Sequence, residues 1–206
     1  MKMSFNFAGE PSYPFHFHHF RRLHMDKKNI WSFGTREVVY AAIGAALYGV
    51  LSWATNIFPL PAAGNVTFRP AVAVLVLFGV AFGPWVGLIA GFLGNVVGDA
   101  ISGWGFFWNW SLGNGLMGLI PGLAAGMIAS FNQRKDIITG IIYSLIGAAV
   151  GMLFASLTEM FTSGIDFNTA LVGYFTPAFI GNAVVIVILL PILMVAYHQI
   201  AGRLGR

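Results

Sequence analysis

The polar side chains best placed to contact a ligand are concentrated between residues 83 and 115, in a stretch that is otherwise apolar. They are carboxylate, amide and indole groups: Asn95, Asp99, Trp104, Trp108, Asn109, Trp110 and Asn114. Asn95 and Asp99 are four residues apart, so a helix places them on one face. Aromatic stacking surfaces beside a few fixed polar groups are typical of ligand pockets. The stretch therefore predicts a pocket for a small, flat, polar molecule.

The tryptophans of this stretch have a second interpretation, because Trp and Tyr gather at membrane–water boundaries whatever the function of the protein. We expect residues 102–110 to form a loop between two membrane helices, and this loop holds Trp104, Trp108 and Trp110. The interleaved amides, and Asp99 a few residues upstream, favour a pocket over an aromatic belt.

Three ionisable residues lie at membrane depth in this chain: Arg69, Asp99 and Glu159. Such groups are costly in a bilayer and are functional by default. All three are expected near the outer ends of their helices, so they can surround one outward-facing cavity. The alternative is that some of them simply lie at the membrane interface. Asn182 is a further inward-facing candidate, although amides within membranes more often join helices.

The sequence contains no recognisable catalytic set. It has no paired-carboxylate motif, no His-Glu-x-x-His motif, no cysteine and no Gly-x-x-x-x-Gly-Lys-Ser/Thr phosphate loop. The histidines of the N-terminal tail have no carboxylate partner nearby that would favour a metal site. We therefore expect a protein that is not an enzyme and that uses neither a cofactor nor a metal ion.

The composition indicates an integral membrane protein. The chain has 206 residues, of which 57% are hydrophobic and only 9% charged, against about 25% charged in soluble domains. We predict an all-α membrane protein, a bundle of six transmembrane helices. The expected spans are residues 38–57, 70–82, 85–101, 111–131, 137–161 and 170–197. The second is short of the ~20 residues needed to cross, so it either extends backwards through residues 66–68 or lies inside the bundle, away from lipid.

The basic residues predict the orientation in the membrane. Lys27, Lys28, Arg36, Arg134, Lys135, Arg203 and Arg206 all fall on one side of a six-span chain. The positive-inside rule makes that side, and both termini, cytoplasmic. We expect a disordered tail over 1–34, with a possible alternative start at Met25, a transmembrane domain over 35–202 and a basic tail over 203–206. The placement of the net charge of +4 fits a lipid bilayer and not nucleic acid.

In the order and content of its motifs, the chain resembles the substrate-binding S component of energy-coupling factor (ECF) vitamin transporters. The first span, VVYAAIGAALYGVL, carries Ala42 and Ala46 in the Ala-x-x-x-Ala pattern of that family, with Ala41 and Ala45 as a second register. The run FGPWVGLIAGFLGNVVGDAISGW…FWNWSLGNGLMGLIPGL is similar to the S-component group called UPF0397. One departure is Asn95, where we expect histidine in that group.

The resemblance implies a mechanism. An S component binds a vitamin or related nutrient from outside the cell, beneath a closing loop, which here is residues 57–68 with Asn65 and Phe68 as candidate contacts. The alanine surface then docks on a transmembrane T component that works with two ATP-binding subunits. ATP hydrolysis by those partners releases the cargo inside. The resemblance leaves thiamine or its pyrimidine precursor, cobalamin, riboflavin and a queuosine precursor open as substrates.

The main alternative is a self-sufficient secondary transporter of a small polar solute in the cell membrane. That function needs coupling-ion groups near the bilayer midplane or a paired repeat, and neither is evident. An intramembrane enzyme would need a nucleophile or metal constellation, and a scaffold would not need an outward polar pocket.

Overall fold

The computed structural model describes residues 29–55 and 67–203, which fold into helices and their connections. Six α-helices follow in order: α1 (Thr35–Thr55), α2 (Val72–Phe82), α3 (Pro84–Ile101), α4 (Trp108–Leu123), α5 (Arg134–Thr162) and α6 (Thr176–Arg203). A 3-10 turn (Ala124–Gly126) follows α4, and a π-helix (Thr169–Phe175) leads directly into α6. The described residues contain no β-strand, so the prediction of an all-α fold is confirmed.

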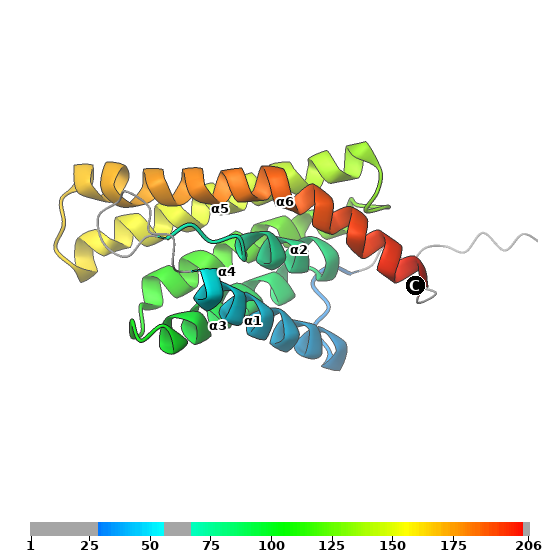
Figure 1. The fold of residues 1–206 in the computed structure, drawn as a ribbon, viewed down its shortest axis with the longest axis horizontal. Helices are drawn as coiled ribbons and strands as arrows, with labels where there is room; N and C mark the ends of the chain where they lie inside the picture. The colour runs from blue at the N-terminus through cyan, green and yellow to red at the C-terminus, as the bar shows by residue number, and fades with distance from the viewer. Residues whose placement is uncertain (1–28, 56–66, 204–206) are drawn as a thin grey trace, which may run out of the picture.

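The helices run up and down along the long axis of the bundle (Figure 1). Four segments are long and apolar enough to cross a membrane, namely α1, α3, α5 and the continuous stretch from the π-helix through α6. The other two helices have 11 and 16 residues, fewer than the ~20 that a bilayer requires. Six full crossings, with both termini in the cytoplasm, stay a prediction.

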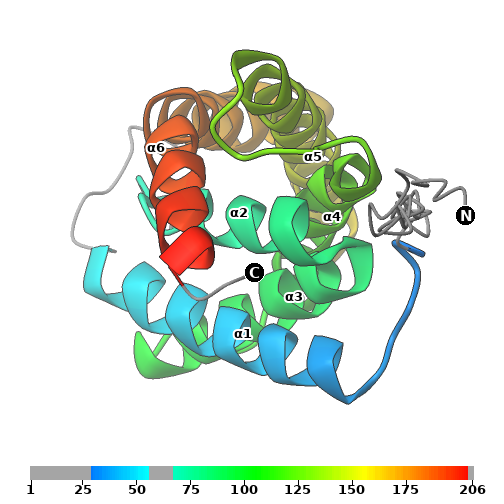
Figure 2. The same cartoon turned by 90° about the vertical axis from the view of Figure 1, so that its right-hand side faces the viewer.

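The short helix α2 lies at the centre of the bundle, surrounded by the longer helices (Figure 2). Most of its residues, including Val72, Leu75, Val76 and Val80, are buried. The sequence left open whether this short apolar segment extends backwards or lies inside the bundle, and the structure shows that it lies inside the bundle. A helix that is apolar on all sides is stable there because it has no water-facing surface.

The connection between α3 and α4 is shorter than the sequence indicates. Gly103 and Gly105 adopt positive φ angles of 73° and 96°, which glycine tolerates, so the chain turns within residues 102–107. Phe107 is extended, and α4 begins at Trp108. The expectation that Trp108 and Trp110 lie in a loop is therefore wrong, because both belong to the first turn of a helix.

Helices α3 and α4 touch backbone to backbone. A Cβ atom added to Gly118 would lie 2.1 Å from the carbonyl oxygen of Gly87, and one added to Gly87 would lie 2.0 Å from the oxygen of Gly118. Only glycine permits this approach, as is common where helices pack within membranes. The contact brings the polar residues of α3 against those of α4.

Helix α1 turns its two alanine registers in different directions, one into the bundle and one out of it. Ala41 and Ala45 are 2% and 6% exposed and pack inside the bundle, against α2 and α3. The expectation that this register belongs to a docking surface is therefore wrong, because no partner can reach it. Ala42 and Ala46 are exposed, and their role in docking stays a prediction.

Candidate functional site

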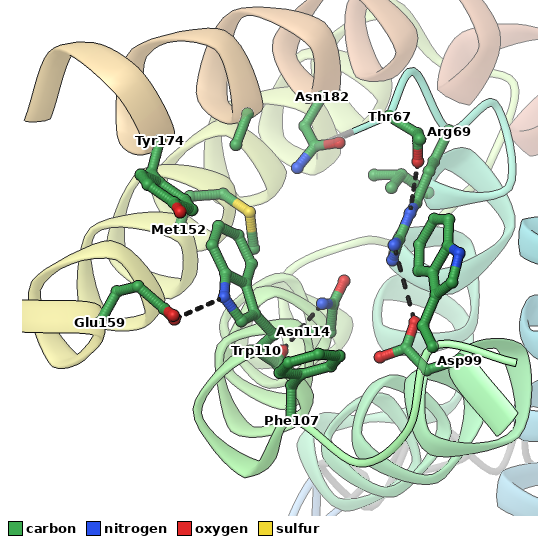
Figure 3. A pocket seen from close by; sticks show the side chains of 13 residues that line it. Thr67, Arg69, Asp99, Phe107, Trp110, Asn114, Met152, Glu159, Tyr174 and Asn182 are labelled. Atoms are coloured by element: carbon green, nitrogen blue, oxygen red, sulfur yellow. Dashed lines mark hydrogen bonds and ion pairs between the residues drawn. The ribbon is translucent and has the colours of Figure 1, made fainter. Parts of the chain in front are cut away.

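A cavity of about 190 Å³, with polar groups among mostly apolar walls, lies at the end of the bundle where α3 and α5 end and α4 begins (Figure 3). Seven of the predicted contact residues line it: Arg69, Asp99, Trp104, Trp110, Asn114, Glu159 and Asn182. They come from the segment before α2, from the connection between α3 and α4, and from α3, α4, α5 and α6. The structure thus gathers residues from across the sequence around one space.

Arg69 holds one side of the cavity together. Its guanidinium lies 3.7 Å from the Asp99 carboxylate, donates to Asn95 Oδ1 at 2.9 Å and donates to Thr67 Oγ1 at 3.1 Å. The same group lies over the indole of Trp104, 5.6 Å from the ring centroid, within the range of a cation–π interaction. Arg69 therefore joins the segment before α2 to α3 and to the connection that follows α3.

Asn95 lies beneath this wall and does not line the cavity. It is 1% exposed, and its amide nitrogen donates to Asp99 at 2.7 Å and to Ser111 at 3.2 Å. The amide of Asn114 in turn donates to Asn95 Oδ1 at 3.2 Å, and the hydroxyl of Tyr48 donates to Asn114 at 2.5 Å. Asn95 is thus a positioning residue for Arg69 and Asp99.

Glu159 forms the opposite side of the cavity (Figure 3). Its Oε2 accepts hydrogen bonds from Asn109 at 2.7 Å and from the indole nitrogen of Trp110 at 3.0 Å, and its Oε1 accepts one from the Ser163 hydroxyl. Asn109 is buried behind this carboxylate and does not line the cavity. The ring of Tyr174, from the π-helix, lies 6.1 Å from that of Trp110 between centroids.

Trp108 points away from the cavity, which corrects its assignment as a contact residue. It is 45% exposed and packs edge-on against Phe154 at 6.4 Å between centroids. Consecutive residues of a helix project about 100° apart, so Trp108, Asn109 and Trp110 face the exterior, α5 and the cavity respectively. In a loop the three side chains would be free to converge, but in a helix they cannot.

The segment before α2 contributes less than predicted. Phe68 packs against the main apolar core and does not line the cavity. Asn65 lies outside the described residues, as does most of the predicted closing loop, residues 57–68. Thr67 and Arg69 are the residues of this segment that reach the cavity.

Six lining residues were not predicted from the sequence: Thr67, Val72, Phe107, Met152, Tyr174 and Ala178. Helical spacing would have found two of them. Met152 lies seven residues, two turns, before Glu159, and Ala178 lies four residues before Asn182. Tyr174 had no such signal, because it belongs to a π-helix, a form that frequently occurs at functional sites.

One exposed carboxylate in the connection after α5 does not line the cavity. Asp166, in the connection after α5, accepts the backbone N–H of Thr169 at 3.1 Å and its hydroxyl at 2.6 Å. These hydrogen bonds to the Thr169 side chain and backbone hold the pKa of Asp166 below its ordinary value. Asp166 is therefore ionised at neutral pH and stabilises the start of the helical stretch that follows.

The chemistry of the cavity is that of binding. It offers aromatic faces, two amides, two carboxylates and one guanidinium. Within residues 29–55 and 67–203, no three His, Asp or Glu side chains are grouped so that they could hold a metal ion. A few fixed polar groups among apolar walls orient a small molecule.

Apolar helices long enough to cross a bilayer, with a polar and aromatic cavity at one end, are the features of a membrane protein that binds a small molecule. A model of the family described as "ECF-type riboflavin transporter, S component" matches residues 32–199. The chain belongs to this family, which is a transporter subunit and not itself a catalyst. The resemblance found in its motifs is thereby confirmed.

Two relatives from other organisms agree with this assignment. The chain is 41% identical to a UPF0397 protein of Vibrio atlanticus (strain LGP32) over 125 residues, 58% of this chain and 68% of the relative. It is 37% identical to a UPF0397 protein of Aliivibrio fischeri (strain MJ11) over 161 residues, 68% of this chain and 87% of the relative.

Proposed function

We propose that this chain is the substrate-binding subunit of an ECF-type importer, which captures a vitamin or related micronutrient from outside the cell in the cavity between Arg69 and Glu159. The observation that carries the proposal is that cavity itself, in a member of the S-component family. Its aromatic walls suit a heterocycle, and its fixed amides and carboxylates suit a polar rim on that heterocycle.

The arrangement of the helix ends supports an outward-facing cavity. Helix α1 begins, α5 begins and α6 ends at one end of the bundle (Figure 1). These positions carry Arg36, Arg134, Lys135 and Arg203, and the positive-inside rule puts them in the cytoplasm. The cavity lies at the other end, where Arg69 is the basic residue that lines it. The chain then spans the cell membrane several times with its binding site open to the exterior.

Delivery requires partners, because no ATP-binding motif occurs in the sequence. In the proposed mechanism, the loaded chain docks on a T component through the exposed face of α1, and two ATP-binding subunits supply the energy. Ala42 and Ala46 make that face shallow, so a partner helix can approach closely. The face also carries exposed apolar side chains such as Ile43, Leu47 and Val50, which suit either lipid or an apolar partner.

Mass spectrometry of the purified protein tests the binding role. Protein purified in mild detergent is denatured, the released small molecules are identified, and the candidate is titrated back against tryptophan fluorescence. We expect one vitamin-like compound to be released and to bind saturably. A protein that releases no compound and binds no vitamin or precursor would contradict the proposed function. Transport by the chain alone in liposomes would favour the secondary transporter instead.

A substitution on α1 tests docking separately from binding. Ala46→Trp puts a large ring on the shallow face without touching the cavity, so we expect unchanged binding and loss of uptake in cells that express the whole importer. Ile146→Trp, at a position on α5 that is 47% exposed, is the matched control and should transport normally. If Ala46→Trp cells take up the cargo at the wild-type rate, this face is not the docking surface.

A further inference from the structure

The two carboxylates of the cavity differ in how their charge is balanced. Asp99 lies 3.7 Å from the Arg69 guanidinium, and this is the one ion pair found among residues 29–55 and 67–203. Glu159, on the opposite side of the cavity (Figure 3), has no basic partner within the same residues. The lining therefore carries one guanidinium and two carboxylates, an excess of one negative charge on the Glu159 side.

Among residues 29–55 and 67–203, Arg69 is the only basic residue that lines the cavity. The segment 56–66, which precedes the cavity residues Thr67 and Arg69, contains no Lys, Arg or His. The remaining basic residues of the described chain belong to the other end of the bundle, at the start of α1, the start of α5 and the last turns of α6: Arg36, Arg134, Lys135, His198 and Arg203.

Both oxygens of the Glu159 carboxylate accept hydrogen bonds. Glu159 is 7% exposed, yet its three hydrogen-bond partners, Asn109, Trp110 and Ser163, all donate to it. A carboxylate has about four acceptor positions, so one is left for a group in the cavity. A buried charge without a counter-charge is costly, and a bound molecule of opposite charge removes that cost.

We propose that the cargo carries a positively charged nitrogen group, and that this group binds between Glu159 and the rings of Trp110 and Tyr174. The inference rests on the proposed function and specifies the charge of the cargo. The two rings line the cavity together with Glu159 and lie 6.1 Å apart between centroids, and aromatic rings of these types attract cations. The π-helix that presents Tyr174 supports a dedicated site, because π-helical turns are frequent at functional positions.

The test compares ligands of different charge on the same purified protein. Water-soluble vitamins and their precursors are sorted by charge at pH 7 into cations such as thiamine, neutral compounds such as riboflavin, and anions such as nicotinate. Each is screened by thermal stabilisation of the full chain, and those that bind are measured by titration calorimetry. We expect the tightest-binding compound, and any compound that co-purifies with the protein, to be a cation.

Two variants that each remove one carboxylate locate the site. Glu159→Gln keeps the shape and one acceptor oxygen but loses the charge, and we expect it to weaken binding of the cation at least about tenfold, as for other buried charge pairs. Asp166→Asn removes one negative charge from the connection that follows α5, outside the cavity, and Asn caps helices as well as Asp does. This control should change the affinity by less than about twofold.

The outcomes separate the inference from the function on which it rests. If the tightest-binding compound is neutral or anionic, or if Glu159→Gln leaves the affinity for the cation unchanged, the inference is wrong while the proposed function stands. If nothing in the panel binds and nothing co-purifies, the proposed function fails and the inference with it. The charge preference of the unmodified protein decides the matter even where Glu159→Gln does not fold.

Discussion

Removing both partners of the Arg69–Asp99 pair should destabilise the protein by less than the sum of the two single substitutions. At the observed separation of 3.7 Å, two unit charges attract by about 4.5 kcal/mol at an effective dielectric constant of about 20. Part of this attraction offsets the cost of taking both groups out of water. Arg69→Met keeps the unbranched stem of the side chain but leaves the Asp99 carboxylate, only 5% exposed, without its counter-charge.

We expect Arg69→Met to lower the free energy of unfolding by about 3 kcal/mol. This is the lower end of the range for broken buried pairs, because the Arg69 side chain is still 16% exposed. Asp99→Asn should cost about 2 kcal/mol, since Arg69 keeps its bonds to Asn95 and Thr67. The double variant should cost about 3 kcal/mol and not the sum of about 5, a coupling energy of about 2 kcal/mol.

The assay is thermal unfolding of the purified chain in detergent, followed by tryptophan fluorescence. For a chain of this length, about 3 kcal/mol corresponds to a fall of about 6–12 °C in the midpoint. Asp136→Asn is not a suitable control, because Asp136 is buried and accepts two backbone N–H groups. Asp166→Asn is the control, because Asp166 is exposed and an Asn at this cap position can still accept the Thr169 N–H. If the effects of the two single substitutions add within about 0.5 kcal/mol, the pair does not couple and the reasoning from its geometry is refuted.

Two further predictions test the assignments of α4. Trp110→Ala removes a cavity wall and the indole donor to Glu159, so the affinity for the cargo should fall at least about tenfold. Trp108→Ala should leave the affinity within about twofold in the same titration. Equal effects of the two substitutions would contradict the assigned helix faces. Gly118→Ala places a Cβ atom 2.1 Å from a backbone oxygen of α3 and should lower the unfolding free energy by about 2 kcal/mol. Gly202→Ala, which has open space around it, should not, and an equally stable Gly118→Ala protein would show that α3 and α4 separate easily.

The tryptophan-rich run shows where sequence reasoning stopped. An aromatic pocket was predicted, and Trp104 and Trp110 line the cavity. Trp108 does not, because the residues were expected in a loop. Gly103 and Gly105 form the turn between α3 and α4. Because the turn is complete before residue 108, the next helix can begin at Trp108. A helix that begins at Trp108 projects Trp108 and Trp110 in different directions.

The alanines of α1 show a second kind of limit. Both registers are equally small and apolar, and helical periodicity puts Ala41 and Ala42 about 100° apart without saying which one faces inward. The choice depends on which side of α1 meets α2 and α3, and the structure puts Ala41 and Ala45 there. Packing against helices distant in sequence therefore decided which alanine register of α1 is buried.

By itself, the sequence determined the class of protein: apolar helices, an ECF S component, and a set of polar and aromatic residues suited to a ligand. These properties follow from composition, helical spacing and motif order, which are local features of the chain. Only the tertiary structure decided that Arg69 pairs with Asp99, that Glu159 lies across the cavity without a counter-charge, and that Trp108 faces outward. Distances between residues far apart in sequence depend on how helices rotate and touch, and glycine contacts such as Gly87–Gly118 set that geometry.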